Sequence, residues 1–257
     1  ELGLSMVINP EKAAALEIFR LLQYPSFLKR DSFAKGSVEL VELKIKENNV
    51  LANTRLDQFR TLSNVNALVC AVERGGMVSI PKGSFSLQVG DKLTIATDAG
   101  DLVRLIKNLG VYTPKAQHVM IIGGSRTAKY LAQRLILILF STAKAAAERL
   151  ISSKVKLTII EKNEKRCQEL SETLPEATIV HGNGTEQGLL IEEGIRKMDA
   201  VVTLTGMDEE NILISMYAQT LNADKVVTKV NRLSFLGMLG NIGLDTIVSP
   251  KTVAANR

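Results

Sequence analysis

The stretch HVMIIGGSRTA, residues 118–128, has the residue types of a phosphate-binding turn. An apolar run leads into two glycines, and a basic and a hydroxyl residue follow them closely. A glycine permits the tight turn, and the first N–H groups of a following helix point toward an anion that the helix dipole also favours. An arginine beside them adds positive charge for a phosphate. The pattern therefore favours nucleotide binding at Gly123, Gly124, Ser125, Arg126 and Thr127.

The spacing departs from the dinucleotide-binding fingerprint in two ways. A G-x-G-x-x-G pattern that starts at Gly123 requires glycines where the chain has Ser125 and Ala128. Glu161, a carboxylate that would accept hydrogen bonds from ribose hydroxyls, follows Gly123 by 38 residues instead of ~20. The extra chain, ILILFSTAKAAAERL (136–150), predicts either a longer first helix or an added apolar turn. From this loop alone, a working nucleotide site and an inactive one both remain open.

Polar residues also follow other apolar runs of the chain. Lys162 comes directly after Glu161, and Asn183 lies in the segment HGNGT. The Asn183 amide offers a donor and an acceptor for the edge of an adenine. The acidic run 208–210 begins a predicted helix, where we expect it to cap the helix and complement its dipole rather than bind a metal.

The histidines and cysteines do not have the spacing of a metal site. His118 and His181 have no second His or Cys at ligand spacing, and Cys70 and Cys167 lack a C-x-x-C pattern. We therefore predict no metal ligand and no disulfide, and a reducing cytosol fits this cysteine usage.

Strands and helices must alternate to position these residues. Near-continuous apolar strands separated by helices are typical of a parallel sheet that is covered on both faces. We therefore predict an α/β fold, a Rossmann-like doubly wound parallel sheet, over residues 118–257. Its ligands would bind at the carboxyl ends of the strands, at the topological switch point. The expected strands are 118–122, 156–160, 177–180, 200–204, 225–230 and 245–249, and the expected helices begin near 126, 163, 186, 208 and 233.

A smaller α+β module is predicted before this sheet, over residues 26–112, with a linker at 113–117. The segment SVELVELKIK, 37–46, alternates apolar and polar residues with one slip at Leu40–Val41, which indicates a bulged strand. A strand, a Gly-Gly turn and a second strand follow, and then a further strand and a helix that ends at Gly110.

The two ends of the chain resemble each other. LGLSMVINPEKAAA (2–15) aligns with IGLDTIVSPKTVAA (242–255) at a constant offset of 240 residues, from Gly3 to Gly243. Each copy predicts a short strand, a proline at a helix start and an alanine-rich helix. A tandem repeat in a longer natural parent explains this, and a chance likeness between two common strand–proline–helix motifs is the alternative.

The composition limits the possible partners. The chain has 257 residues, 46% of them hydrophobic, and 32 basic against 27 acidic residues give a net charge of +5. Its charged residues form no run of five like charges, so we predict no nucleic-acid partner. The longest apolar run, 135–140, is far shorter than the ~20 residues that span a bilayer. The N-terminus also lacks the regions of a secretory signal, so we expect a soluble cytoplasmic chain.

Taken together, several motifs resemble the RCK (regulator of potassium conductance) family. They are TIIEKNEKRCQELSETLP, VHGNGTEQGLLIEEGI, DAVVTLTGMDEENILISMYAQ, VVTKVNR, GLDTIVSPKTVAAN and, in the smaller module, RGGMVSIPKGSFSLQVGDKL. The resemblance extends along essentially the whole chain. It implies two Rossmann-like N-type halves, each followed by a small C-type module. Residues 1–25 would then be the tail of a preceding Rossmann half and its linking helix, residues 26–112 an RCK C-type module, and residues 118–257 an RCK N-type nucleotide-binding domain.

The family resemblance also implies a function. RCK proteins of this type assemble as homo-oligomers, from dimers to rings, at the inner face of the cell membrane. Their partner is a membrane potassium-translocating subunit, which they gate when a nucleotide binds. The resemblance implies NAD or NADH as that nucleotide, with ATP or ADP as the alternative. It implies a regulatory role without catalytic residues.

Matched by position, the resemblance assigns a role to individual residues. The phosphate loop would be 123–127, with Glu161 and the adjacent Lys162 at the ribose. Asn183 would lie near the adenine, where the family usually has Asp. The family loop is commonly Gly-Gly-Gly with another glycine two residues later, and its first crossover is shorter than the one here. The crevice would be completed by Thr205, Asp208 and Asn211, with Lys229 and Arg232 at its far side or at an intersubunit contact.

Two other classes of function stay open. An NAD-dependent oxidoreductase would need a general acid or base near the nicotinamide, for which the sequence offers only His118 and His181. An interaction module with an inactive nucleotide pocket is the other class. The resemblance also allows the small module to bind a second messenger such as a cyclic dinucleotide at a dimer interface, as some family members do. Ile80 and Pro81 are suitably placed for this, with ordinary strand-end residues as the alternative interpretation.

Overall fold

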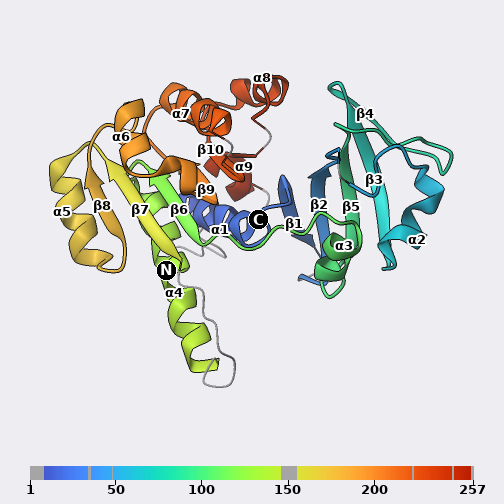
Figure 1. Ribbon diagram of the computed structural model, residues 1–257, viewed down its shortest axis with the longest axis horizontal. Helices are drawn as coiled ribbons and strands as arrows, with labels where there is room; N and C mark the ends of the chain where they lie inside the picture. The colour runs from blue at the N-terminus through green and yellow to red at the C-terminus, as the bar shows by residue number, and fades with distance from the viewer. Residues whose placement is uncertain are drawn as a thin grey trace, which may run out of the picture. The chain divides into compact units, whose positions relative to one another are not determined.

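The computed structural model describes residues 9–33, 36–47, 49–145, 155–221, 223–244 and 246–255, with the backbone alone for 138–145, Leu236 and Asn241. The chain divides into two compact units. One unit, 24–114, carries an antiparallel sheet (Figure 1). The other joins 1–23 to 115–257 and carries a parallel sheet. The predicted boundaries at 25–26 and 112–118 fall close to these divisions.

The parallel unit alternates strands and helices in the predicted order. Each of the six predicted strands is present, and their bounds differ from the expected ones by at most two residues where the structure describes them. The strands are β6 (His118–Ile122), β7 (Lys156–Glu161), β8 (Thr178–His181), β9 (Ala200–Thr203), β10 (Lys225–Lys229) and β11 (Ile247–Val248), and the helices between them are α4 (Arg126–Ala145), α5 (Glu164–Thr173), α6 (Gln187–Glu192), η4 (Ile195–Lys197), α7 (Asp208–Thr220), η5 (Leu233–Phe235), α8 (Leu236–Leu239) and η6 (Gly240–Ile242).

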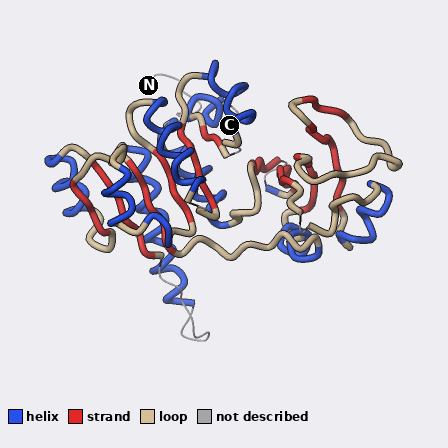
Figure 2. The backbone as a smooth tube through the Cα atoms, turned by 45° about the horizontal axis from the view of Figure 1, so that its top comes forward, coloured by secondary structure: helices blue, strands red, loops and turns tan. Residues whose placement is uncertain are grey.

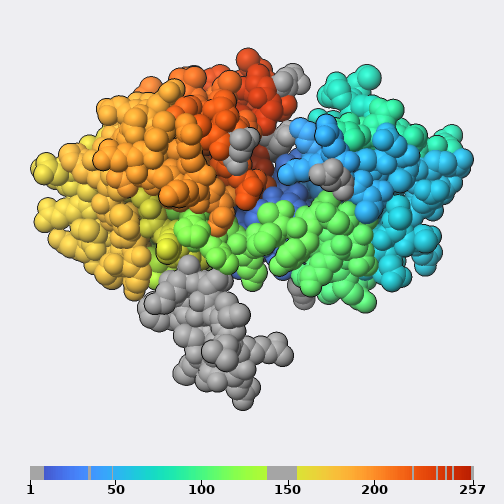
Figure 3. Space-filling view, viewed as in Figure 1, coloured from blue at the N-terminus to red at the C-terminus, as the bar shows by residue number. Residues whose placement is uncertain are grey.

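All six strands of this sheet run parallel, in the order β11-β10-β9-β6-β7-β8. Figure 2 shows the strands side by side with helices on both faces. The order reverses between β6 and β9, and this reversal is the switch point of a doubly wound sheet. β8 forms one edge of the sheet and pairs with β7. The space-filling view shows the chain of α5 and α6 (yellow to orange) at that end of the unit (Figure 3). The predicted fold class is therefore confirmed for this unit.

The helix α1 (Pro10–Gln23) packs within the same unit, against α4 and α9 (Pro250–Ala255). Most of its apolar residues are buried, and Ala14 and Ile18 join a core with Leu131 and Leu135 of α4. Both α1 and α9 begin at a proline, at the positions that the internal repeat predicts. Residues 2–8 of the first copy lie outside the described residues.

The central strands are buried because helices cover both of their faces. All residues of β9 and β10 are buried, and so are four of the five residues of β6. Alternate β6 side chains point to opposite faces, so Val119 and Ile121 join one core while Met120 and Ile122 join the other. The carboxyl ends of β6, β7 and β9 are thereby held rigidly, which is what a binding site at that edge requires.

The smaller unit is a five-stranded antiparallel sheet in the order β1-β2-β5-β3-β4. The predicted hairpin, the further strand and the closing helix are all present, whereas an edge strand and a short helical segment were not predicted. Its elements are β1 (Lys29–Phe33), β2 (Val38–Lys44), η2 (Leu56–Gln58), α2 (Phe59–Ser63), β3 (Ala67–Arg74), β4 (Met77–Ser79), β5 (Lys92–Asp98) and α3 (Leu102–Asn108).

The bulge predicted at Leu40–Val41 is wrong. β2 pairs in unbroken register with both β1 and β5, and its alternate residues Glu39, Val41 and Leu43 point inward. The alternation of apolar residues suggested a bulge because the inward-facing residue before Val41 is a glutamate, Glu39. Arg30 donates two hydrogen bonds to its carboxylate, at 2.9 and 3.1 Å, which makes its burial tolerable. The bulge of this sheet lies in β3 instead, between Val69 and Ala71.

The first crossover of the parallel unit contains a long helix. α4 runs for 20 residues, and its last turns extend beyond the end of the sheet (Figure 1). Of the two alternatives for residues 136–150, the longer first helix is correct as far as Ala145. Residues 146–154 lie outside the described residues.

Candidate functional site

A cavity of about 470 Å³ opens at the carboxyl ends of β6, β7 and β9. Its position is the switch point of the sheet, where ligands bind in open α/β folds. The volume is in the range of small-molecule pockets. Seven of the predicted site residues line it: Gly123, Gly124, Ser125, Glu161, Lys162, Asn183 and Thr205.

Two glycines of the loop after β6 cannot be replaced without a clash. Gly123 has a φ of +100°, and a Cβ there would lie 2.7 Å from the backbone of Leu204. A Cβ on Gly124 would lie 2.7 Å from the Leu170 side chain and 2.9 Å from Oε2 of Glu161. The two glycines therefore let the loop pass between the end of β9 and the side chains beyond β7.

Glu161, the last residue of β7, faces this loop. Its Oε2 accepts a hydrogen bond from the Gly124 N–H at 2.5 Å, and its Oε1 accepts one from the Asn163 N–H at 2.7 Å. A carboxylate offers about four lone-pair positions, so both oxygens keep capacity to accept from ribose hydroxyls. Glu161 also lines the cavity, as a ribose-binding carboxylate must.

Arg166, in the first turns of α5, was not among the predicted residues. Its Nε donates to the Gly124 carbonyl at 2.6 Å, and its Nη1 pairs with Glu169 at 2.7 Å. Asn163 caps α5 by accepting the Arg166 N–H at 3.0 Å. Their place in the first turn of a predicted helix after Glu161 indicates that both residues lie near the end of β7, but it does not indicate the contact of Arg166 with the Gly124 carbonyl.

Asn183 lies in the loop after β8, on the far side of the cavity. Its Oδ1 accepts from the N–H of Thr185 at 3.1 Å and from the hydroxyl of Thr185 at 2.9 Å, so this side chain braces its own loop. The neighbouring Gly184 lies against the sheet, because a Cβ there would overlap Ile122 of β6. The loop is thus held close over the end of β6.

Thr205 and Asn211 link the loop after β9 to α7. The Asn211 side chain accepts from the Thr205 N–H at 2.8 Å and donates to the carbonyl of Lys229 at 3.1 Å. Asn211 is fully buried and does not line the cavity, whereas Thr205 does. Asn211 therefore joins the ends of β9 and β10 and does not face a ligand directly.

Lys229, at the end of β10, is buried beside this junction. Its Nζ donates to the Thr205 carbonyl at 2.8 Å. Burial lowers the pKa of its amine, and the negative charges of Asp208 and Glu11 oppose that shift without cancelling it. It lies outside the set of residues that line the cavity.

Asp208 and Arg232 form a second cluster away from the cavity lining. The Asp208 carboxylate accepts from the backbone N–H groups of Asn231 and Arg232, at 2.9 to 3.0 Å. Arg232 in turn pairs with Glu209. The acidic run 208–210 does occupy the first turn of α7, but its first carboxylate caps the loop after β10 rather than the helix.

Arg126 and Thr127 follow the glycine loop but do not line the cavity. Thr127 is buried, and Arg126 is exposed and forms an ion pair with Glu11 of α1 at 2.7 Å. The charge expected beside the phosphates thus points toward α1. The cation that faces the cavity from the neighbouring strand end is Lys162, whose Nζ lies 3.6 Å from Glu210.

The histidine and cysteine side chains have structural partners. His118 lies at the amino end of β6, with Nδ1 3.4 Å from Asp199. Cys167 lies on the buried side of α5, where burial raises the pKa of its thiol. His181 lies within 3.2 Å of the Lys162 carbonyl. The described part of the chain contains no cluster of three potential metal ligands. Its described helices also include none with the length and hydropathy of a membrane span.

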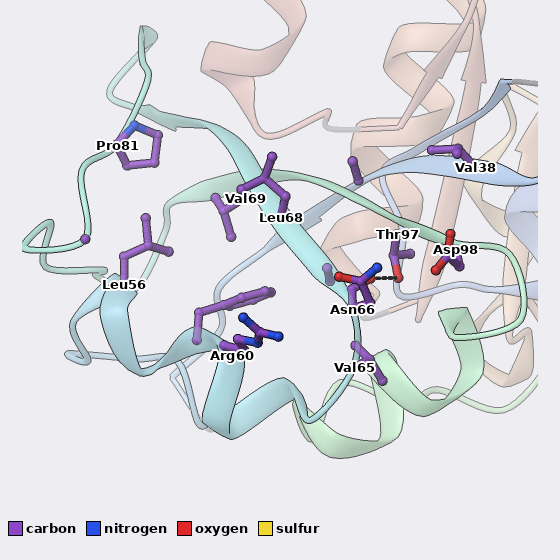
Figure 4. A pocket seen from close by; sticks show the side chains of 14 residues that line it. Val38, Leu56, Arg60, Val65, Asn66, Leu68, Val69, Pro81, Thr97 and Asp98 are labelled. Carbon is purple, nitrogen blue, oxygen red and sulfur yellow. Dashed lines mark hydrogen bonds between the residues drawn. The ribbon is translucent and has the colours of Figure 1, made fainter.

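A second cavity, of about 590 Å³, lies in the smaller unit. Figure 4 shows its lining: Leu56 and Arg60 from the helical segment, Asn66 and Leu68 at the start of β3, and Asp98 at the end of β5. Pro81, one of the two residues that we expected near a second messenger, lines it. Ile80 is exposed but does not line the cavity.

Two domain models match the chain. The TrkA-C domain matches residues 40–110, in the smaller unit, and the TrkA-N domain matches residues 139–250, in the parallel unit. The second match begins within α4 and therefore leaves out β6 and the glycine loop.

Curated relatives match along the whole chain. The chain is 29% identical to "Trk system potassium uptake protein TrkA homolog 2" of Methanosarcina mazei, over 100% of this chain and 54% of the relative. It is 30% identical to the TrkA homolog of Archaeoglobus fulgidus, over 99% of this chain and 54% of the relative, and 27% identical to TrkA of Haemophilus influenzae, over 96% and 51%. The chain thus spans about half the length of these relatives.

Solved structures share the fold. The RCK domain of GsuK superposes with a TM-score of 0.60 at 18% identity, covering 99% of this chain and 51% of that one. A GsuK channel bound to NAD superposes with a TM-score of 0.59, also at 18% identity, covering 99% of this chain and 42% of that one.

Proposed function

The chain carries a TrkA-C domain followed by a TrkA-N domain and is homologous along its length to Trk potassium uptake proteins, and on that premise we propose that it regulates potassium uptake by binding a nucleotide. It would act as part of a cytoplasmic regulatory subunit, peripheral at the inner face of the membrane. Its partner would be a membrane potassium-translocating subunit of the Trk type, and it would assemble with further copies into a homo-oligomer, from a dimer to a ring.

The observation that carries this proposal is the cavity at the switch point of the parallel sheet. Gly123 and Gly124 on one side and Glu161 on the other supply a tight turn and a carboxylate where a nucleotide needs them. The ligand would be NAD or NADH, with ATP or ADP as the alternative. A neighbouring fold, the GsuK channel, is bound to NAD, which supports the first choice.

The mechanism would be a population shift. A nucleotide that binds one conformation of the assembly more tightly than another favours that conformation by its difference in affinity. The membrane partner would sense the favoured conformation. This role needs binding and coupling but no chemical step.

The test uses Glu161→Gln with Glu172→Gln as its matched control, because Glu172 is exposed on α5 outside the cavity. Each carboxylate oxygen of Glu161 accepts one backbone N–H. A glutamine keeps one of these acceptors and turns an NH2 group toward the other backbone N–H. We expect NAD, NADH, ATP or ADP to raise the Tm of the wild type and of the control variant. In calorimetry, Glu161→Gln should bind at least tenfold more weakly, about 1.4 kcal/mol.

The transport arm measures potassium flux in proteoliposomes that hold the full-length protein and its membrane subunit. A nucleotide that binds should change the flux, and Glu161→Gln should remove that response. Equal nucleotide responses in wild type and Glu161→Gln would contradict a regulatory role for this site. Turnover of a hydride-transfer substrate would favour the oxidoreductase alternative, although the described residues that line the cavity include no His or Cys.

The cavity of the TrkA-C domain supports a second candidate function, binding of a nucleotide second messenger. Arg60 offers a cation and Asn66 an amide beside apolar walls (Figure 4). Cyclic di-AMP should then raise the Tm of the wild type and of Glu161→Gln equally, and Arg60→Met should remove that effect. Loss of the effect in Glu161→Gln would place the ligand in the other cavity.

A further inference from the structure

Four hydrogen bonds join the glycine loop to the start of α5 in a closed ring. The Gly124 N–H donates to Glu161, and the Asn163 N–H donates to the other Glu161 oxygen. Asn163 accepts the Arg166 N–H, and the Arg166 side chain returns to the Gly124 carbonyl. We call these four residues the Gly124 ring: Gly124, Glu161, Asn163 and Arg166.

The Gly124 ring holds the loop on both sides. The N–H of Gly124 meets a carboxylate at 2.5 Å and its carbonyl meets a guanidinium at 2.6 Å. Hydrogen bonds with one charged partner are shorter and stronger than neutral ones. The ion pair between Arg166 and Glu169, at 2.7 Å, fixes the guanidinium from its outer side. The loop is therefore preformed before any ligand arrives.

The Gly124 ring explains how a loop with Ser125 and Ala128 keeps a phosphate-binding shape. Gly123 supplies the positive φ and Gly124 supplies the close approach, but neither fixes the direction of the following peptide groups. The N–H groups at the start of α4 point at a phosphate only if the Gly124 carbonyl is held away from it. Arg166 donates to that carbonyl, and the Arg166 side chain lines the same cavity.

We propose that Arg166 is a positioning residue of the nucleotide site, which fixes the Gly124 carbonyl so that the loop presents its N–H groups to the phosphates. The inference deepens the proposed function and rests on it for its ligand. Arg166 would act through the loop, and its direct partner in the protein is a backbone oxygen.

The experiment compares Arg166→Met, Arg166→Lys and Glu169→Gln with the control Arg196→Met. Arg196 is exposed on η4 and lies outside the cavity lining, so its substitution removes the same charge without touching the loop. Two quantities are measured in each protein: the affinity for NAD and ADP by calorimetry, and the exchange rate of the Gly124 amide hydrogen by NMR.

We expect Arg166→Met to raise Gly124 amide exchange at least tenfold and to weaken nucleotide binding by about tenfold. Arg166→Lys should recover part of the slow Gly124 exchange and part of the affinity. Its amine donates one hydrogen bond to the Gly124 carbonyl but lacks the forked guanidinium that also pairs with Glu169. Glu169→Gln should show a smaller loss of affinity. It also replaces Arg166→Met in the test if that variant does not fold. Arg196→Met should match the wild type.

The two hypotheses fail separately. A wild type that binds none of the nucleotides overturns the proposed function, and the ring is then judged by Gly124 amide exchange alone. A wild type that binds, with Arg166→Met equal to it in affinity and in Gly124 exchange, overturns the positioning role. A lower Tm in Arg166→Met with both quantities unchanged also overturns it, since Arg166 would then only stabilise α5.

Discussion

At the scale of single residues, the proposed ribose contact of Glu161 predicts which nucleotides bind. Its carboxylate is fixed by two backbone N–H groups, so it cannot turn away from a ligand. A 2′-phosphate on the ribose would bring negative charge against it. We predict that NAD binds at least tenfold more tightly than NADP in calorimetry, and that Glu161→Gln narrows this ratio. A ratio near one in the wild type would contradict a ribose-facing Glu161.

Gly184 is a residue at which one methyl group should matter. A Cβ there would overlap Ile122, a buried residue of the central strand that cannot move aside cheaply. We predict that Gly184→Ala lowers the free energy of unfolding by about 2 kcal/mol in urea denaturation. Gly188→Ala is the control, since a Cβ on that residue of α6 meets nothing within 4 Å and alanine favours the helix. Equal stability of the two variants would mean that the loop after β8 can move away from β6 without a cost in free energy.

Lys229 should make stability depend on alkaline pH. Burial lowers the pKa of its amine in the folded protein below the value of 10.5 in an unfolded chain. Between these two values the unfolded chain binds more protons, so the free energy of unfolding contributed by Lys229 rises as pH increases. We predict that the stability of the wild type relative to Lys229→Met increases as pH is raised toward 10.5, measured by urea denaturation at a series of pH values. A constant difference would mean that the amine is not desolvated.

The sequence predicted the residues that follow each strand, because strand ends of a parallel sheet meet at one edge. Glu161, Asn183 and Thr205 line the cavity for that reason. The direction of Arg126 could not be predicted, since its partner Glu11 comes from a helix far away in the sequence. Arg166 was missed because its role depends on a contact between α5 and a backbone carbonyl, which residue types do not encode.

At the scale of elements, an ion pair joins the end of β3 to the start of β5, between the half-exposed Arg74 and the buried Asp91. Arg74 donates two bonds to Asp91 at 2.7 Å, and the Gln88 N–H donates a third at 2.9 Å. Burial alone would raise the pKa of Asp91, but these bonds outweigh it and hold the pKa below the usual 3.8. The pair should therefore stabilise the sheet above that value and lose its contribution as pH falls through the lower, folded pKa.

We predict that Asp91→Asn lowers the free energy of unfolding of the TrkA-C domain by about 2 kcal/mol at neutral pH, because the buried amide would turn an NH2 group toward the Arg74 and Gln88 donors. The difference from the wild type should shrink as pH falls below 3.8. Asp57→Asn is the control, since its partner Arg55 is exposed and such pairs contribute little. A loss of stability as small as that of the control would show that the Arg74–Asp91 pair is dispensable.

Most elements could be predicted from periodicity, and the exceptions have physical reasons. The strand β1, KRDSF, is a polar edge strand with no apolar alternation to reveal it. The bulge was expected in β2 because Glu39 interrupts the apolar face, and the pairing of Glu39 with Arg30 is a tertiary contact. The parallel strands were predicted well because burial on both faces leaves long runs of Val and Ile.

At the scale of the whole chain, the two units have separate hydrophobic cores. One core gathers Phe27, Val41 and their neighbours, and the cores of the parallel unit share no buried residue with it. Residues without shared partners contribute to stability almost additively. We predict that Gly184→Ala and Asp91→Asn together add within about 0.5 kcal/mol, with each variant increasing hydrogen exchange only in its own unit. A larger coupling would mean that the two sites share a network of contacts, and faster hydrogen exchange in both units from one variant would mean that the units unfold together.

The long helix α4 has a consequence for how such proteins are recognised. β6 and β7 pair residue for residue, from His118 with Lys156 to Ile122 with Ile160, although the crossover between them is longer than the fingerprint expects. The long connection therefore leaves the register of the sheet intact. The TrkA-N match starts at residue 139, within α4, and so leaves out the glycine loop. A genome survey that counts phosphate loops only within matched segments would score this chain as having lost its loop, while Gly123 and Gly124 still stand at the end of the central strand.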